Sequence, residues 1–173
     1  MVNKIINGCL LLISGILINA QAPPTGTWKS YNAFREVRSL SGNNDRIFCA
    51  SRGGIFYFRP GEDEFKTITR LDGLSDFDIT SIKYIDAYNF LAVGYANGNF
   101  DLVTPEMIIN VPFIKEKSIT AGKSINNFYV LDNRLFICTS FGLIKFNLDR
   151  KEIIETYFIG ENNTYAPVYD VVH

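Results

Sequence analysis

Short hydrophobic runs alternate with polar residues along most of the chain, and this pattern predicts β-strands rather than helices. Gly, Asn, Asp and Pro residues separate the runs, and no amphipathic helix is predicted after the N-terminal segment. The protein is therefore predicted to be all-β. The expected strands are 37–40, 46–50, 55–58, 65–70, 79–85, 90–95, 100–103, 108–114, 125–131, 135–139, 143–148 and 153–159.

A repeat relates these strands to one another. Gly54, Gly98 and Gly142 recur at intervals of 44 residues in the 173-residue chain. Each is expected to turn a structural hairpin, which joins an apolar strand to one with alternating apolar and polar residues. One face of the outgoing strands is expected to carry the pairs Phe56/Phe58, Phe100/Leu102 and Ile144/Phe146.

Four short antiparallel strands in each repeat of about 44 residues are typical of a β-propeller blade. A blade-junction turn at Asp72, Gly73 and Leu74 is predicted to join the first two blades. The predicted bounds are 37–70 for blade one, 79–114 for blade two, 125–159 for blade three and 166–173 for the start of a fourth blade.

The predicted domain, residues 21–173, is thus a partial β-propeller of about three to three and a half four-stranded blades. Closed propellers need about four to eight blades. The chain is therefore expected to be the N-terminal part of a longer protein. Residues 28–31 are expected to supply the outer strand of the final blade, which would close the ring.

The first 20 residues are predicted to be a signal peptide. Lys4 precedes an apolar run from Ile5 to Ile18, and small residues follow, with cleavage favoured after Ala20. An uncleaved membrane anchor is the alternative, but the apolar run is short for a membrane span. The protein is accordingly expected to be exported to the periplasm or the cell surface, with no membrane span after cleavage.

Composition and motifs exclude several classes of function. The formal net charge of −1 leaves no basic surface for nucleic acid. Cys49 and Cys138 lie in predicted strands, which favours buried thiols over a disulfide, and neither has a metal-ligand spacing. The only histidine is His173, so no catalytic triad can be assembled. We predict no enzyme activity, no catalytic residues, no metal site and no cofactor.

Three further motifs are better explained by structure than by chemistry. The acidic cluster 62–64 is predicted to be a solvated hairpin tip. Asp72, Asp76 and Asp78 surround a glycine but do not follow the order of a calcium-binding loop. Aromatic residues such as Tyr57, Tyr95 and Tyr157 could stack on sugars, but are expected mainly to fill the space between blades. Residues 162–164 fit a glycosylation sequon.

Several motifs together resemble known propeller families. LDGLSDFDITSI (71–82) resembles the blade junction of two-component-regulator propellers. Four other segments resemble, in order, the N-terminal β-propeller of the PorZ family, which belongs to the type IX secretion system of Bacteroidota. They are TWKSY (27–31), GYANGNFDLV (94–103), AGKSINNFYV (121–130) and FGLIKFNLDRKEIIETYFIG (141–160).

The PorZ-family resemblance implies a seven-bladed ring, a second propeller and a C-terminal sorting domain in the complete protein. It implies an outer-membrane-associated attachment complex, with a sortase-like protein and outer-membrane proteins as partners and anionic lipopolysaccharide as a further one. The expected role is an accessory one that supports sortase-dependent processing and anchoring of cargo. The resemblance assigns no binding residues to this chain.

Two alternatives are open. The periplasmic sensor propeller of a hybrid two-component regulator shares the DGLSD junction and would bind an oligosaccharide. A propeller enzyme that cleaves polysaccharides would need convergent acids or a His/Tyr set near the central axis, and this half of a ring shows neither. Sequence downstream of residue 173 would distinguish a sorting domain from a transmembrane helix and kinase.

Overall fold

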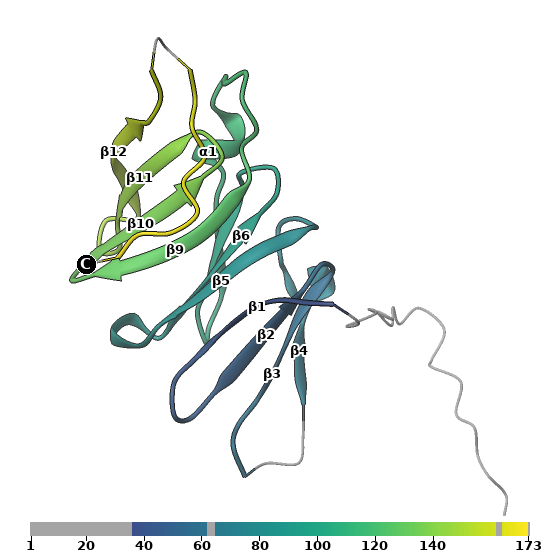
Figure 1. Ribbon diagram of the computed structural model, residues 1–173. Coiled ribbons are helices and arrows are strands. Elements are labelled where there is room, and N and C mark those ends of the chain that lie inside the picture. The colour runs from purple at the N-terminus through teal and green to yellow at the C-terminus, as the bar shows by residue number, and fades with distance from the viewer. Residues whose placement is uncertain (1–35, 62–64, 162–163, 173) are drawn as a thin grey trace, which may run out of the picture.

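The computed structural model describes residues 36–61, 65–161 and 164–172. They form three four-stranded antiparallel sheets, and in each sheet the strands lie in chain order (Figure 1). Blade one contains β1 (Val37–Gly42), β2 (Ile47–Ser51), β3 (Gly54–Phe58) and β4 (Lys66–Ile68). Blade two contains β5 (Ile79–Ile85), β6 (Phe90–Tyr95), β7 (Phe100–Val103) and β8 (Ile108–Val111). Blade three contains β9 (Ile125–Leu131), β10 (Arg134–Thr139), β11 (Gly142–Asn147) and β12 (Glu152–Phe158).

The three sheets stand side by side along the chain, as consecutive blades of a propeller do (Figure 1). The first strand of each blade lies next to the first strand of the following blade, because β1 packs against β5 and β5 packs against β9. The all-β partial propeller predicted from the sequence is confirmed. These first strands are the inner strands of the ring, and β4, β8 and β12 are the outer ones.

The strand predicted over 108–114 is wrong at its end. β8 stops at Val111, and residues Phe113–Glu116 form a single helical turn, α1. Pro112 explains the difference, because its nitrogen carries no hydrogen and cannot extend the ladder of the sheet. Ile114 of this turn is buried between blades two and three. Within the described part of the chain, no helix is long and apolar enough to cross a membrane.

Polar side chains join the inner strands. The Ser41 hydroxyl of β1 accepts a hydrogen bond from the backbone N–H of Tyr84 in β5, at 2.7 Å. The Thr80 hydroxyl of β5 donates to the carbonyl of Ile125 in β9, at 2.6 Å. The bonded residues are 43 and 45 positions apart, close to the repeat length. Equivalent positions of successive blades therefore face one another.

The described C-terminal residues continue this pattern without forming a strand. The Asn126 amide of β9 donates to the Val168 carbonyl at 2.8 Å, across 42 positions. The backbone N–H of Val168 in turn donates to the Thr139 carbonyl at 2.9 Å. Residues 164–172 thus follow the inner strand of blade three, where the first strand of a further blade would lie. That a fourth blade starts here stays a prediction.

The hairpin of blade two is longer than those of blades one and three. The β2–β3 and β10–β11 hairpins each turn within two residues. In blade two the backbone N–H of Tyr95 donates to the Asn99 carbonyl at 3.1 Å, so that residues 96–98 form a three-residue turn. Because side chains alternate along a strand, one extra residue moves every side chain of β7 to the opposite face.

The prediction that Phe56/Phe58, Phe100/Leu102 and Ile144/Phe146 share one face is therefore wrong. Phe100 and Leu102 point toward blade three, where the Phe100 and Phe146 ring centroids are 5.2 Å apart. Phe146 points back toward blade two, and Phe58 lies on the side of β3 away from blade two. The register change instead directs Asp101 toward blade one.

Gly98 makes the longer turn possible. Its φ is +85°, in the left-handed region that glycine adopts without strain, and its N–H donates to the Tyr95 carbonyl at 3.2 Å. A β-carbon built on Gly98 would lie 2.9 Å from the side chains of Ile114 and Lys123. Gly98 is therefore constrained both by its backbone conformation and by the connection to blade three.

We predict that Gly98→Val lowers the free energy of unfolding by about 3 kcal/mol, because it adds backbone strain and a steric clash. Gly61→Ala is the matched control, because Gly61 also has a positive φ (+93°) but no atom within 4 Å of a new β-carbon. The control should lose about 1 kcal/mol, from strain alone. Chemical denaturation of the intact protein measures both. Equal losses would contradict the packing assigned to Gly98.

Candidate functional site

The connection between blades one and two begins with a capped turn. The Asp72 carboxylate accepts hydrogen bonds from the backbone N–H and the hydroxyl of Thr69, each at 2.8 Å. These bonds cap the start of the short 3-10 helix η1 (Arg70–Asp72). Gly73 ends this helix with a φ of +111°, and Leu74 is buried. The structure thus places the predicted junction residues Asp72, Gly73 and Leu74 between β4 and β5. Asp72 and Gly73 shape the turn, and the buried Leu74 anchors it.

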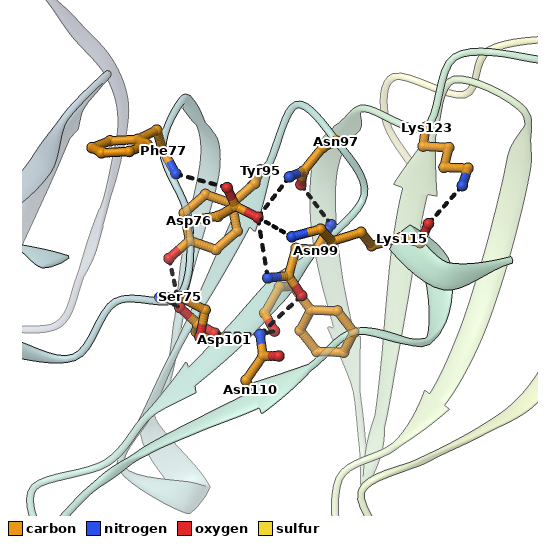
Figure 2. Close-up of polar contacts among 11 residues, drawn as sticks. Ser75, Asp76, Phe77, Tyr95, Asn97, Asn99, Asp101, Asn110, Lys115 and Lys123 are labelled. Carbon is orange, nitrogen blue, oxygen red and sulfur yellow. Dashed lines mark hydrogen bonds and ion pairs between the residues drawn. The ribbon is translucent and has the colours of Figure 1, made fainter.

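Asp101 of β7 is the central acceptor of this junction (Figure 2). Its carboxylate is fully buried and accepts three hydrogen bonds. The donors are the Ser75 backbone N–H at 2.8 Å, the Tyr95 hydroxyl at 2.5 Å and the Asn110 side-chain amide at 2.9 Å. A buried carboxylate is tolerated only when such donors replace water. Asp101 therefore fixes the incoming connection to the body of blade two.

The Tyr95 hydroxyl is held in its donating form. Burial, and then the charge of the neighbouring Asp101 carboxylate, raise the pKa of Tyr95 far above its usual value. The raised pKa agrees with the role of this hydroxyl as the donor to Asp101. Tyr95 was considered as a sugar-stacking residue from the sequence, but it is completely buried, so the structure assigns it to the junction.

Asp76 forms a second acceptor centre nearer the surface (Figure 2). Its carboxylate receives the Lys115 ammonium at 2.7 Å, the Asn97 amide at 2.6 Å and the Asn99 amide at 3.4 Å. Burial alone would raise the pKa of Asp76, but the hydrogen bonds from Lys115, Asn97 and the Phe77 backbone outweigh it and lower that pKa to about 2.

Asparagine side chains connect the two carboxylates. The Asn110 amide donates to the carboxylate of Asp101 and to the side-chain oxygen of Asn99, both at 2.9 Å, while Asn99 reaches Asp76. Lys115 belongs to α1, in the connection between blades two and three. One continuous set of hydrogen bonds therefore joins both blade connections. We call these residues (Ser75, Asp76, Tyr95, Asn97, Asn99, Asp101, Asn110 and Lys115) the junction network.

Asp78 is held separately, by two arginines of blade one. The Arg38 and Arg52 side chains lie 2.7 Å and 3.1 Å from its carboxylate. The three aspartates around the junction thus bind different protein partners and do not converge on one point. No group of three His, Cys, Asp or Glu side chains in the part of the chain that the structure describes could hold a metal ion.

The remaining predicted residues fall in hairpins, in strands or outside the described ranges. Gly54 and Gly142 begin β3 and β11, directly after two-residue turns. Cys49 and Cys138 are buried free thiols in different blades. Burial raises the pKa of both, that of Cys138 to about 11 with a further contribution from Asp170, so neither is an activated nucleophile. The predicted signal peptide (1–20), residues 28–31, the acidic cluster (62–64), residues 162–163 and His173 lie outside the described residues.

A cavity of about 280 Å³ opens between blades one and two. Phe48 and Tyr57 of blade one and Tyr84 of blade two lie along one wall, and the Phe48 ring centroid is 5.2 Å from each of the other two. Arg46 and Glu106 also border it. Tyr57 is one of the aromatic residues considered for sugar stacking from the sequence, but its proximity to Phe48 and Tyr84 depends on the folded structure.

Comparison with known proteins identifies related propellers. The family described as the N-terminal β-propeller domain of PorZ, from the type IX secretion system, matches residues 47–172. PorZ from Porphyromonas gingivalis, described as an essential bacterial surface component of that system, is 26% identical, with a TM-score of 0.67 over 72% of this chain and 17% of its own. No curated protein matches the chain.

Two other structures share the fold at lower identity. The extracellular domain of a hybrid two-component system from B. thetaiotaomicron is 18% identical, with a TM-score of 0.61 over 83% of this chain and 19% of its own. The computationally designed Ika4 protein is 10% identical, with a TM-score of 0.57 over 80% of this chain and 79% of its own. The chain thus spans less than a fifth of either natural protein.

The junction network predicts a specific response to acid. The pKa of Asp76 is lowered on folding, so its contribution to stability is complete above the ordinary aspartate pKa of about 3.9 and is lost as the pH falls toward 2. Asp76→Asn should cost about 1–2 kcal/mol at pH 7, and this deficit should shrink below pH 4. Urea denaturation at several pH values measures it.

Glu116→Gln is the control for this experiment, because Glu116 lies on the same helical turn as Lys115 and is exposed. It should leave both the stability and its pH dependence nearly unchanged. A deficit of Asp76→Asn that stays constant from pH 7 to pH 2 would contradict the ionised role of Asp76.

Proposed function

The chain belongs to the family of PorZ N-terminal β-propeller domains, and on this premise we propose that it is a non-enzymatic binding module of type IX secretion. The single observation that carries the proposal is the family match, which runs from β2 to residue 172 and so includes parts of all three blades. The site geometry agrees with a scaffold, since the buried polar groups of the junction network are used to hold blades together.

In this proposal the protein is exported and acts in the periplasm or at the cell surface, in association with the outer membrane. Its partners are a sortase-like protein and outer-membrane proteins of an attachment complex, with anionic lipopolysaccharide as a further ligand. Its role is to support the sortase-dependent processing and anchoring of cargo. The chain covers only 17% of the PorZ structure, so partners and cargo rest on the family resemblance.

The connections between blades are the best candidates for protein contacts. Each outer strand is followed by a connection to the next inner strand, so these connections lie at the same end of every blade. They expose large apolar side chains: Leu71 (58%) and Phe77 (60%) before blade two, and Phe113 (52%) before blade three. The Arg70 guanidinium lies 4.4 Å from the Phe77 ring centroid. Exposed aromatic and arginine side chains together are typical of protein interfaces.

The sensor propeller of a two-component regulator is the alternative. Its support is the DGLSD junction and an extracellular domain that is 18% identical, which shows the fold alone. The two proposals differ in the consequence of losing the protein. Loss of a secretion module leaves cargo unprocessed, whereas loss of a sensor changes the transcription of its target genes.

We predict that deletion of the gene in its native bacterium leaves type IX cargo unprocessed, and that the full-length protein restores processing. A tagged full-length protein should co-purify with a sortase-like protein of the outer membrane. The double substitution Phe77→Ser/Phe113→Ser should abolish this co-purification without unfolding the protein. Ile154→Ser, which changes an exposed apolar residue of the outer strand β12, is the matched control and should leave it intact.

Normal cargo processing in the deletion strain would overturn the proposal. A transcriptional change without a processing defect would favour the sensor alternative instead.

A further inference from the structure

Blades one and two enclose the cavity between their facing sheets, and this interface is packed differently from the next one. Between blades two and three, the aromatic rings of Phe100, Phe128 and Phe146 pack against one another and belong to a continuous buried core. Between blades one and two, the rings of Tyr57 and Tyr84 are only half-buried and border an opening of about 280 Å³. This volume is near the lower end of the range for small-molecule sites, about 300–1,000 Å³.

One wall of the cavity is aromatic. The buried Phe48 ring is stacked on Tyr84 (28°) and tilted by 32° to Tyr57, so the two half-buried tyrosines are the rings of this wall that a ligand can reach. The hydroxyl of Tyr84 donates to the side-chain oxygen of Asn89 at 2.7 Å, which fixes the ring at the blade-two side. The apolar face of a ligand can pack against the accessible parts of Tyr57 and Tyr84, while their hydroxyls remain available for hydrogen bonds.

The rim of the cavity is polar, with donors and acceptors close together. Arg46 contributes a guanidinium, which also reaches Asn89 at 3.5 Å, and Glu106 contributes an exposed carboxylate. Glu106 belongs to the β7–β8 hairpin, which is held by a hydrogen bond from the Thr104 backbone to the Met107 carbonyl at 2.9 Å. The rim is therefore attached to ordered backbone on both blades.

This combination selects one class of ligand. A purely apolar group would leave Arg46 and Glu106 to be desolvated without partners. An anion would be attracted by Arg46 but would approach the carboxylates of Glu106 and Asp72, which also borders the cavity. A pyranose ring has an apolar face of C–H groups and an edge of hydroxyls that both donate and accept. We propose that the cavity between blades one and two binds one neutral hexose ring.

In the bound state the apolar face of the sugar packs on the aromatic wall, and its hydroxyls bond to Arg46, Asn89 and Glu106. The cavity lies between two blades that are both described in the structure. The proposal does not depend on a role in type IX secretion.

Saturation-transfer NMR on the full-length protein tests the proposal, with the neutral methyl glycosides of glucose, galactose and mannose as probes and glucuronate as the charged probe. At least one neutral glycoside should bind saturably, and more tightly than glucuronate. Tyr57→Leu should weaken that binding about tenfold by removing part of the aromatic wall. Glu106→Gln changes only an exposed rim carboxylate, so it should keep the fold and weaken binding several-fold.

The matched controls lie in blade three and on α1. Tyr129→Leu removes a half-buried tyrosine that packs on Phe136, outside the cavity, and Glu116→Gln removes an exposed carboxylate of α1. Both should bind the glycoside as the unaltered protein does. The proposal is overturned if no neutral glycoside binds saturably, if glucuronate binds best, or if binding survives both Tyr57→Leu and Glu106→Gln. Because cargo processing is not the readout, a failure here leaves the proposed secretion role to be judged separately.

Discussion

The buried carboxylate of Asp101 is the constraint on which the joint between blades one and two depends. A charge with no solvent must be fully hydrogen-bonded, and its three donors come from the incoming connection, from β6 and from β8. None of these donors can move away without leaving the carboxylate unsatisfied. Asn110 also donates to Asn99, and Asn99 donates to Asp76, so the two carboxylates belong to one hydrogen-bond network. Lys115, in the connection that enters blade three, donates to Asp76 and joins this connection to the network. The connections that enter blades two and three thereby acquire one defined geometry against blade two.

Much of the fold could be predicted from the sequence because strand periodicity and turn chemistry are local. The bounds predicted for β7 and β9 are those observed, and the 44-residue repeat predicted blades with four strands each. The faces of β7 could not be predicted, because the extra turn residue is Gly98 itself. Gly98 keeps its place in the 44-residue repeat, and only the pairing of β7 with β6 shifts, which changes the face to which each side chain points. For the same reason Asp101 looked like an ordinary polar position between Phe100 and Leu102. Its burial becomes visible only when Ser75, Tyr95 and Asn110 are brought together in space.

The proposed binding role fits an architecture in which successive blades pack against one another, as β1 packs against β5 and β5 against β9. The buried side chains pack the blades against one another. The places available for binding are therefore the connections between blades and the interfaces that side chains do not fill completely. Exposed Phe77 and Phe113 at one end of the blades, and the aromatic cavity between blades one and two, are two such places with different chemistry. The first suits a protein surface and the second a small polar ring. A binding module of the kind proposed would use both without any reactive group.

Amide hydrogen exchange in the full-length protein tests the role of Asp101 most directly, with Asp101→Asn compared to the unaltered protein. Asp149→Asn is the matched control, because Asp149 also accepts from a tyrosine hydroxyl (Tyr88, 2.6 Å) and an asparagine amide (Asn133, 2.8 Å), but at the exposed surface. If Asp101 fixes the incoming connection to blade two, Asp101→Asn accelerates exchange at Ser75 and through β5–β8, while β10–β12 and the control stay protected. Unchanged exchange at Ser75, or equal acceleration in both variants, would contradict the account.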